Sequence, residues 1–88
     1  MIVLIFGGGR WAKLYCSIIE NELNQVSKIV MYSPSHYQDL NSWVMNKGLT
    51  RTRVIERIDQ LPEMPSHCFV VNSSRDHAKS TRWCLNNN

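Results

Sequence analysis

Three consecutive glycines, Gly7-Gly8-Gly9, lie between a short apolar run and a segment with helical spacing. With Arg10-Trp11-Ala12 they give the pattern G-x-G-x-x-A, in which the backbone can closely approach the pyrophosphate of a dinucleotide. The N–H groups and positive dipole end of the following helix would hold the phosphates, and Arg10 would add a positive charge. The segment therefore predicts a nucleotide-binding turn. The alternative interpretation is a flexible turn that binds nothing.

The residues after the next apolar run bear on which nucleotide would bind. A carboxylate about 20 residues beyond the glycines usually holds the ribose hydroxyls of NAD, but Tyr32-Ser33 occupies that position here. Ser33, Ser35 and His36 could hydrogen-bond a 2′-phosphate, which would meet no repulsion from a carboxylate. The pattern thus favours NADP over NAD as the cofactor, although Ser33 could equally serve as a helix cap.

Around these residues the chain alternates between strand and helix patterns. Branched apolar residues predict a buried strand at 2–6, and apolar residues at helical spacing predict a helix from Arg10 to about Leu23. The residues expected on the apolar face of that helix are Trp11, Leu14, Tyr15, Ile18, Ile19 and Leu23. A second strand is expected from Lys28 to Tyr32.

A second helix should follow. It would start at Ser33-Pro34 or at a capping box formed by Ser35 and Gln38. It would end at Asn46-Lys47-Gly48, where glycine can adopt the left-handed conformation that closes a helix. One face of this helix carries Tyr37, Leu40, Trp43 and Val44.

The last part of the chain predicts two more strands and a helix. Arg53 to Ile58 has the pattern of an edge strand, and His67 to Asn72 that of a buried strand. A final helix from about Arg75 to Leu85, capped by Ser73 or Ser74, would place Ala78, Thr81, Arg82 and Leu85 inward. The order predicts an α/β fold in three layers, with four mostly parallel strands ordered 3-2-1-4 and helices on both faces, in one domain spanning 1–88.

The glycine turn and the segment Val70-Val71-Asn72-Ser73-Ser74-Arg75-Asp76-His77-Ala78 give the chain a resemblance to a known family. It resembles the N-terminal Rossmann-type domain of the glucose-fructose oxidoreductase and inositol dehydrogenase family, in which Arg-Trp commonly follows the second glycine. That family carries a Thr or Ser at the end of its fourth strand, then one or two prolines or an Asn, and a His that opens the next helix. Here Asn72, Ser73 and His77 fall on those positions, and both expected prolines are absent.

The resemblance implies the cofactor half of an NAD(P)-dependent oxidoreductase. In the family, the next strand delivers a Glu-Lys-Pro motif with a catalytic lysine, and a further domain supplies the substrate pocket. The sequence stops at Asn88, before both, so we expect cofactor binding without a catalytic set in this chain. The residues expected to bind the cofactor are Gly7, Gly9, Arg10, Trp11, Tyr32, Ser33, Ser35, His36, Asn72, Ser73, Ser74 and His77, the last three beside the nicotinamide.

The composition argues against nucleic-acid binding, membrane insertion and metal binding. A formal charge of +3 with scattered basic residues does not favour nucleic acid as a partner, and the first apolar run is too short for a membrane span. Three cysteines with no paired or metal-ligand spacing indicate free thiols in a reducing cytoplasm and no metal site.

Two alternatives stay open at this point. One is a non-catalytic α/β interaction module that pairs with itself or with a partner domain through an open sheet edge. The other is a binder of a sugar nucleotide or an adenosyl ligand, because the fold by itself does not determine the ligand.

Overall fold

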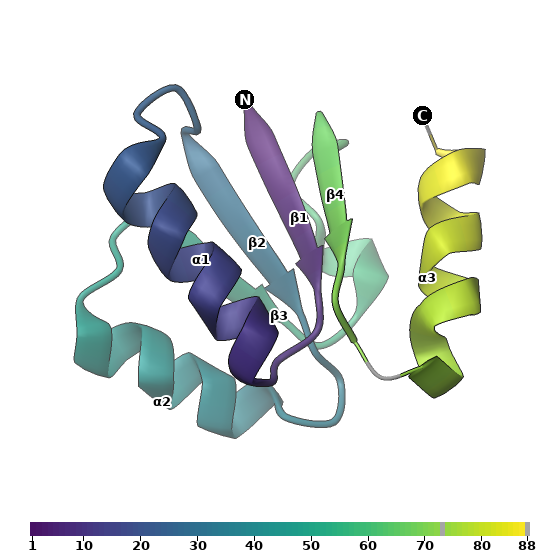
Figure 1. Ribbon diagram of the computed structural model, residues 1–88, viewed down its shortest axis with the longest axis horizontal. Coiled ribbons are helices and arrows are strands. Elements are labelled where there is room, and N and C mark those ends of the chain that lie inside the picture. Colours follow the sequence, from purple (N-terminus) through teal and green to yellow (C-terminus); the bar gives the residue numbers. More distant parts are fainter. Residues whose placement is uncertain (73, 88) are drawn as a thin grey trace.

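A computed structural model describes residues 1–72 and 74–87 and shows a single parallel sheet with helices on both of its faces (Figure 1). The strands β1 (Ile2–Phe6), β2 (Lys28–Tyr32), β3 (Thr52–Ile55) and β4 (His67–Val70) are ordered β3-β2-β1-β4, and all their pairings are parallel. The helices are α1 (Arg10–Glu22), α2 (Tyr37–Lys47), the 3₁₀ helix η1 (Ile58–Gln60) and α3 (Ser74–Asn86). The predicted α/β fold and strand order are confirmed. This order is that of the first half of a doubly wound, Rossmann-type sheet.

Alternation along the central strand divides the core between the two faces. Val3 and Ile5 of β1 belong to the cluster that α1 and α2 cover, whereas Leu4 and Phe6 belong to the cluster that includes Cys84 of α3. Every residue of β1 is buried, as expected for a strand with neighbours on both sides and helices above and below. The sheet therefore presents the ends of its strands, rather than either face, to ligands.

Helix α1 packs with a different face from the one that the sequence predicted, and the two faces share only Ile19. Ile19 is buried against the sheet with Ala12 and Cys16, whereas Trp11, Leu14, Tyr15, Ile18 and Leu23 are each at least 37% exposed. The physical reason is the short turn from β1, which brings the helix so close to the sheet that only small side chains fit at Ala12 and Cys16. The large apolar residues are displaced to the flank.

The inward face of α3 was also predicted wrongly. Ser80 and Cys84 are buried and Trp83 is half-buried, whereas Ala78, Thr81, Arg82 and Leu85 are exposed. A serine can face inward here because the amide of Asn72 donates a hydrogen bond of 2.7 Å to its hydroxyl. The apolar character of the side chains therefore does not identify the face of α3 that packs against the sheet.

The second helix agrees better with expectation. Leu40 and Val44 of α2 are buried with Tyr37 and Trp43 packed beside them, and Gly48 closes the helix at φ 65° as predicted. The predicted caps are wrong, however, because α2 begins at Tyr37 and His36 precedes it without a side-chain capping bond. The edge position of β3 is confirmed.

Both later strands are shorter than predicted. β3 stops at Ile55, and Arg57 to Leu61 instead form the 3₁₀ turn around η1, which the side chain of Gln60 closes by accepting from Glu56 and Arg57 N–H. β4 stops at Val70 and lies at the edge of the sheet, as the predicted strand order requires. Its residues alternate between exposed and half-buried, so the expected burial of this strand is wrong.

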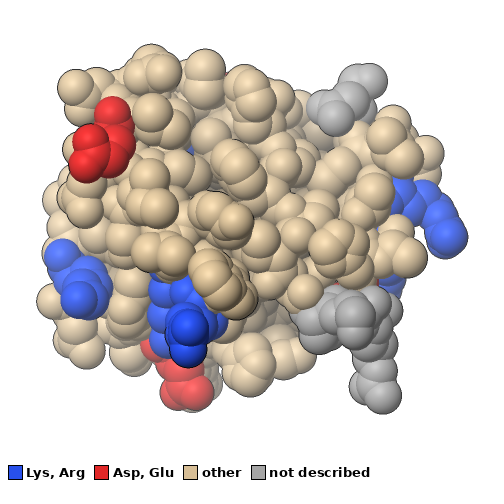
Figure 2. All heavy atoms as spheres, in the orientation of Figure 1, with Lys and Arg blue, Asp and Glu red and all other residues tan. Residues whose placement is uncertain are grey.

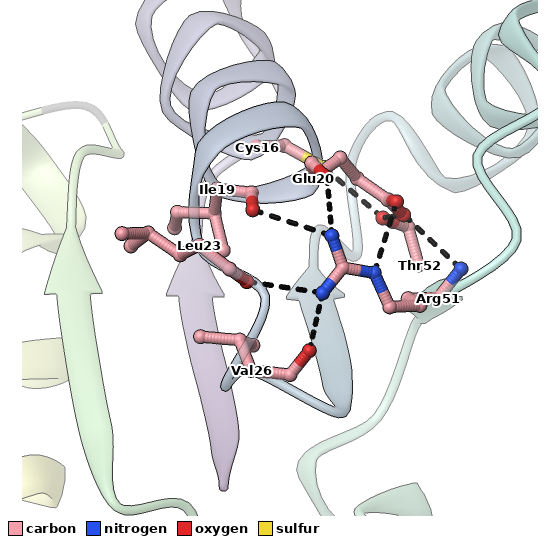
Figure 3. A network of polar contacts seen from close by, with 7 residues as sticks. All are labelled: Cys16, Ile19, Glu20, Leu23, Val26, Arg51 and Thr52. Atoms are coloured by element: carbon pink, nitrogen blue, oxygen red, sulfur yellow. Dashed lines mark hydrogen bonds and ion pairs between the residues drawn. The ribbon is translucent and has the colours of Figure 1, made fainter.

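A network centred on Arg51 joins the end of α1 to the start of β3 (Figure 3). The guanidinium of Arg51 donates to four backbone carbonyls, those of Ile19, Glu20, Leu23 and Val26. The Glu20 carboxylate accepts from the Arg51 amide at 3.1 Å and from the Thr52 hydroxyl at 2.7 Å. Arg51 thereby bonds carbonyls in and just beyond the last turn of α1, where a helix leaves carbonyls without intrahelical partners. The Ile19 carbonyl also accepts from Leu23 N–H.

We expect Arg51→Met to lower the free energy of unfolding by about 2 kcal/mol, because it removes charge-assisted hydrogen bonds to partly buried carbonyls. The matched control is Arg53→Met, two residues further along the chain in β3, where the side chain is exposed. Its effect should stay within about 0.5 kcal/mol. Urea unfolding followed by circular dichroism measures both values. Equal effects of the two substitutions would show that the network around Arg51 contributes no specific stability.

The thiols of Cys68 and Cys84 lie together where α3 meets β4. Burial, followed by hydrogen bonding and charge coupling with Cys84, raises the pKa of Cys68 to about 12. Burial also raises the pKa of Cys16. Because the thiolate is the reactive form, these effects make the thiols of Cys16 and Cys68 unreactive near neutral pH.

At pH 8 we expect Cys68 in the native protein to react with a small alkylating reagent at least about tenfold more slowly than in urea, since folding depletes its thiolate. Mass spectrometry of digested samples would locate the modified cysteine at each time point. Alkylation of Cys68 at equal rates in the native and unfolded protein would contradict the buried, protonated state.

Candidate functional site

A cavity of about 490 Å³ lies where the carboxyl ends of the strands meet the helix starts. In open parallel sheets this edge, beside the point where the strand order reverses, is where ligands bind. Four segments line the cavity: the end of β1 with the glycine turn, the loop after β2, the chain after β4, and one side of α3. The lining residues are Phe6, Gly7, Gly8, Gly9, Tyr32, Ser33, Pro34, Ser35, His36, Ile58, Val71, Asn72, Asp76, Lys79, Ser80 and Trp83.

The three glycines at the cavity floor have different roles. Gly7 has φ 136°, and a Cβ there would come within 3.0 Å of the Val71 carbonyl oxygen, so only glycine fits. A Cβ on Gly8 would lie 2.5 Å from the Ser33 hydroxyl oxygen, so this position must be small for packing. A Cβ on Gly9 would meet nothing within 4 Å, and the space in front of that residue is open.

The start of α1 is electrostatically suited to an anion. Gly9 is its N-cap and provides no side-chain cap, and the first turn contains no acidic residue. The first N–H groups of a helix have no carbonyl partners within the helix and carry the positive end of its dipole. Since Gly9 lines the cavity, this positive end lies beside the open space.

The loop after β2 forms the second wall. Ser33 is only 3% exposed because it packs under Gly8, so its side chain supports the glycine turn instead of capping α2. Ser35 and His36 are exposed and line the cavity. They also line a shallower neighbouring depression, together with Asp39 and Glu56.

The chain after β4 contributes a polar group that no described residue satisfies. Asn72 donates to Ser80, but its side-chain oxygen Oδ1 is buried and accepts no hydrogen bond from any described residue. Buried acceptors are almost always satisfied in folded proteins. An orphan acceptor in a cavity wall is therefore a candidate contact for a ligand N–H or O–H group.

An aromatic cluster forms the apolar wall of the cavity. The ring of Phe6 packs edge-on against both Tyr32 and Trp83, with centroids 5.7 Å apart in each pair. Ile58 extends this wall, and Asp76 and Lys79 of α3 place one charge of each sign beside it. Apolar walls with a few convergent polar groups are typical of small-molecule sites.

Some of the residues predicted to bind the cofactor lie together in the structure, and others do not. Among the predicted cofactor-binding residues, the cavity brings together Gly7, Gly9, Tyr32, Ser33, Ser35, His36 and Asn72. Arg10, Trp11 and His77 are exposed and do not line it, and the guanidinium of Arg10 lies 5.7 Å from the Trp11 ring centre. Ser73 and the side chain of Ser74 lie outside the described residues.

The sequence predicted that α3 contributes Ser74 and His77, but it did not identify the α3 residues that line the cavity. These are Asp76, Lys79, Ser80 and Trp83, which recur at the i, i+3, i+4, i+7 spacing of one helix face. The spacing is visible in the sequence, but a face composed of an aspartate, a lysine and a serine does not resemble an inward face.

Comparisons of the chain with protein-family models, with curated proteins and with solved structures give no match. Within residues 1–72 and 74–87, no helix has the length and apolarity needed to cross a bilayer. The same residues contain no group of three or more His, Cys, Asp or Glu side chains arranged to hold a metal ion.

The different surroundings of the glycines predict different effects of Gly→Ala substitutions. Gly7→Ala should lower the free energy of unfolding by about 2 kcal/mol or more, because it combines positive φ with a backbone clash. Gly9→Ala should lower it by less than about 1 kcal/mol, because the site is open and its backbone is extended. Chemical denaturation of both variants tests this order, and an equal loss would contradict the turn geometry described here.

Proposed function

We propose that this chain is an NAD(P)-binding domain of an oxidoreductase, of the type found in the glucose-fructose oxidoreductase and inositol dehydrogenase family. The observation that carries the proposal is the open space in front of Gly9, at the uncapped positive end of α1 and inside the cavity at the strand ends. Backbone N–H groups at a helix start bind phosphate well, and the absence of a Cβ at Gly9 allows close approach.

The other walls suit the remaining parts of a dinucleotide. The loop from Tyr32 to His36 offers hydroxyl and imidazole groups to a ribose. Phe6, Ile58 and Trp83 offer an apolar surface to a base, and Lys79 adds a positive charge for a phosphate. The Oδ1 of Asn72, which no described residue satisfies, would accept a hydrogen bond from an exocyclic amine, an amide or a ribose hydroxyl.

The preference for NADP over NAD rests on the loop after β2. Ser33, Ser35 and His36 follow that strand without a carboxylate, as the sequence indicated, but Ser33 is buried under Gly8. A 2′-phosphate would therefore be held by Ser35 and His36, with Asp39 and Glu56 nearby in the adjoining depression. These two acids oppose the extra phosphate, so we expect the preference to be small.

The chemistry of the proposed function is divided between the cofactor and the protein. A bound nicotinamide supplies hydride transfer. The residues of this chain bind the phosphates at the glycine turn, orient the ribose and exclude water along the aromatic wall. Substrate binding and proton transfer would then be the task of groups beyond those described here.

Titration with NADPH and with NADH is the direct test. We expect saturable quenching of tryptophan fluorescence with both, because Trp83 lines the cavity, and somewhat tighter binding of NADPH. Gly9→Ala should weaken both by at least about tenfold, since its Cβ would enter the space proposed for the phosphates.

The matched control is Gly48→Ala, a glycine that also has open space around it but lies at the end of α2. It should leave nucleotide affinity unchanged while costing some stability, because its φ of 65° favours glycine. Absence of saturation with either nucleotide, or equal affinity of Gly9→Ala and the wild type, would overturn the proposal.

A further inference from the structure

The outer edge of β4 carries no charged residue or proline that would discourage strand pairing. β4 ends the sheet and pairs with β1, and His67–Val70 contains no Lys, Arg, Asp, Glu or Pro. The opposite edge strand, β3, is equally short but carries the exposed Arg53. Charged residues on edge strands discourage association, and their absence leaves an edge able to accept another strand.

The backbone of β4 has a hydrogen-bonding pattern that could pair with itself. Val71 N–H donates to the Phe6 carbonyl, so the backbone groups of alternate residues from Phe69 onward point to β1. The backbone N–H and C=O groups of Cys68 and Val70 then point away from β1, toward the open edge. A twofold axis through Phe69 would place Cys68 of one copy opposite Val70 of another, as an antiparallel pair that exchanges both hydrogen bonds.

The same axis would bring aromatic side chains together. The two Phe69 residues would form a non-hydrogen-bonded cross-strand pair, in which side chains lie closest. Phe69 is 36% exposed and stacks on Tyr15 of α1, with ring centroids 5.8 Å apart. The result would be a continuous aromatic row, Tyr15 and Phe69 from each copy, over the joined strands.

The flank of α1 beside β4 is complementary to itself. Trp11, Tyr15, Ile18 and Glu22 recur at intervals of four, three and four, so they share one side of the helix. The first three are exposed apolar residues, and Figure 2 shows a wide area over α1 and β4 without charged side chains. Exposed patches of this kind mark interaction surfaces.

The charges at the two ends of α1 favour a second copy of this chain as the partner that binds this surface. Arg10, whose guanidinium lies over Trp11, begins the helix, and Glu22 ends it. This distribution opposes the helix dipole, which favours acids at the start and bases at the end. Tyr15 lies near the middle of α1 and stacks on Phe69, so a twofold axis there would bring Arg10 of each copy level with Glu22 of the other.

We infer that two copies of this chain form a twofold dimer by antiparallel pairing of their β4 strands. The four strands of each copy would join in one sheet of order β3-β2-β1-β4-β4-β1-β2-β3, with the α1 flanks facing each other across the aromatic row. The contact is isologous, so it closes at two copies and does not propagate into a fibre. It does not depend on nucleotide binding.

Sedimentation equilibrium of the full chain up to millimolar concentration tests the dimer. We expect a monomer–dimer equilibrium that Ile18→Lys and Phe69→Lys each weaken by at least about tenfold, because each places like charges in an apolar contact. Met45→Lys is the matched control, since Met45 is 74% exposed on α2, and it should leave the equilibrium unchanged. Circular dichroism verifies that the variants are folded.

A charge exchange tests the antiparallel arrangement itself. Arg10→Glu and Glu22→Arg should each weaken self-association, because each places two pairs of like charges level with each other across the axis. Mixing the two variants should restore association as a heterodimer, in which both pairs are again of opposite sign. In the wild type, amide exchange at Cys68 and Val70 should slow as concentration rises.

Three results would overturn the inference. One is a monomer at every concentration. Another is a dimer that Phe69→Lys and Ile18→Lys leave intact. The third is the lack of any restored association in the mixture of the two charge variants, which would exclude the arrangement of the helices.

Discussion

The reversal of the chain between β1 and α1 is the constraint on which the rest of the structure depends. Gly7 must adopt positive φ with its Cα hydrogen directed at the backbone of Val71, and this fixes the distance between the first and last strands at their carboxyl ends. The turn also sets α1 so close to the sheet that Ala12 and Cys16 are fully buried. The cavity and the displaced apolar flank of α1 both follow from this close approach.

The architecture was predictable because short sequence patterns, such as apolar runs and glycines at turns, identify each element. The five apolar residues of β1, the glycine turn and Gly48 each identify an element or its end, and right-handed crossovers then leave few strand orders. Helix orientation was less predictable because two faces of α1 are apolar, and the choice between them depends on how closely it approaches the sheet. For α3, the buried serine is acceptable only because Asn72, eight residues earlier, is its partner.

The site was predictable only where its residues follow a strand directly. Gly7, Gly9, Ser35 and His36 were found because the ends of parallel strands meet at one edge of the sheet. Spacing places Lys79 and Trp83 on one face of α3, but which way that face turns depends on the packing of the whole core, as does the docking of Ile58. Arg10 was misplaced because position in sequence does not specify where a long side chain lies, and here it rests on Trp11.

The network centred on Arg51 makes the end of α1 depend on a segment that follows much later in the chain. Its bonds to Glu20 span 31 residues of chain, so the last turn of α1 acquires its hydrogen-bond partners only when β3 has joined the sheet. A short helix is marginal in water without tertiary contacts. Folding should therefore be cooperative across β1, α1 and β3, and a nascent chain that has not yet emerged beyond Thr52 would carry a frayed first helix.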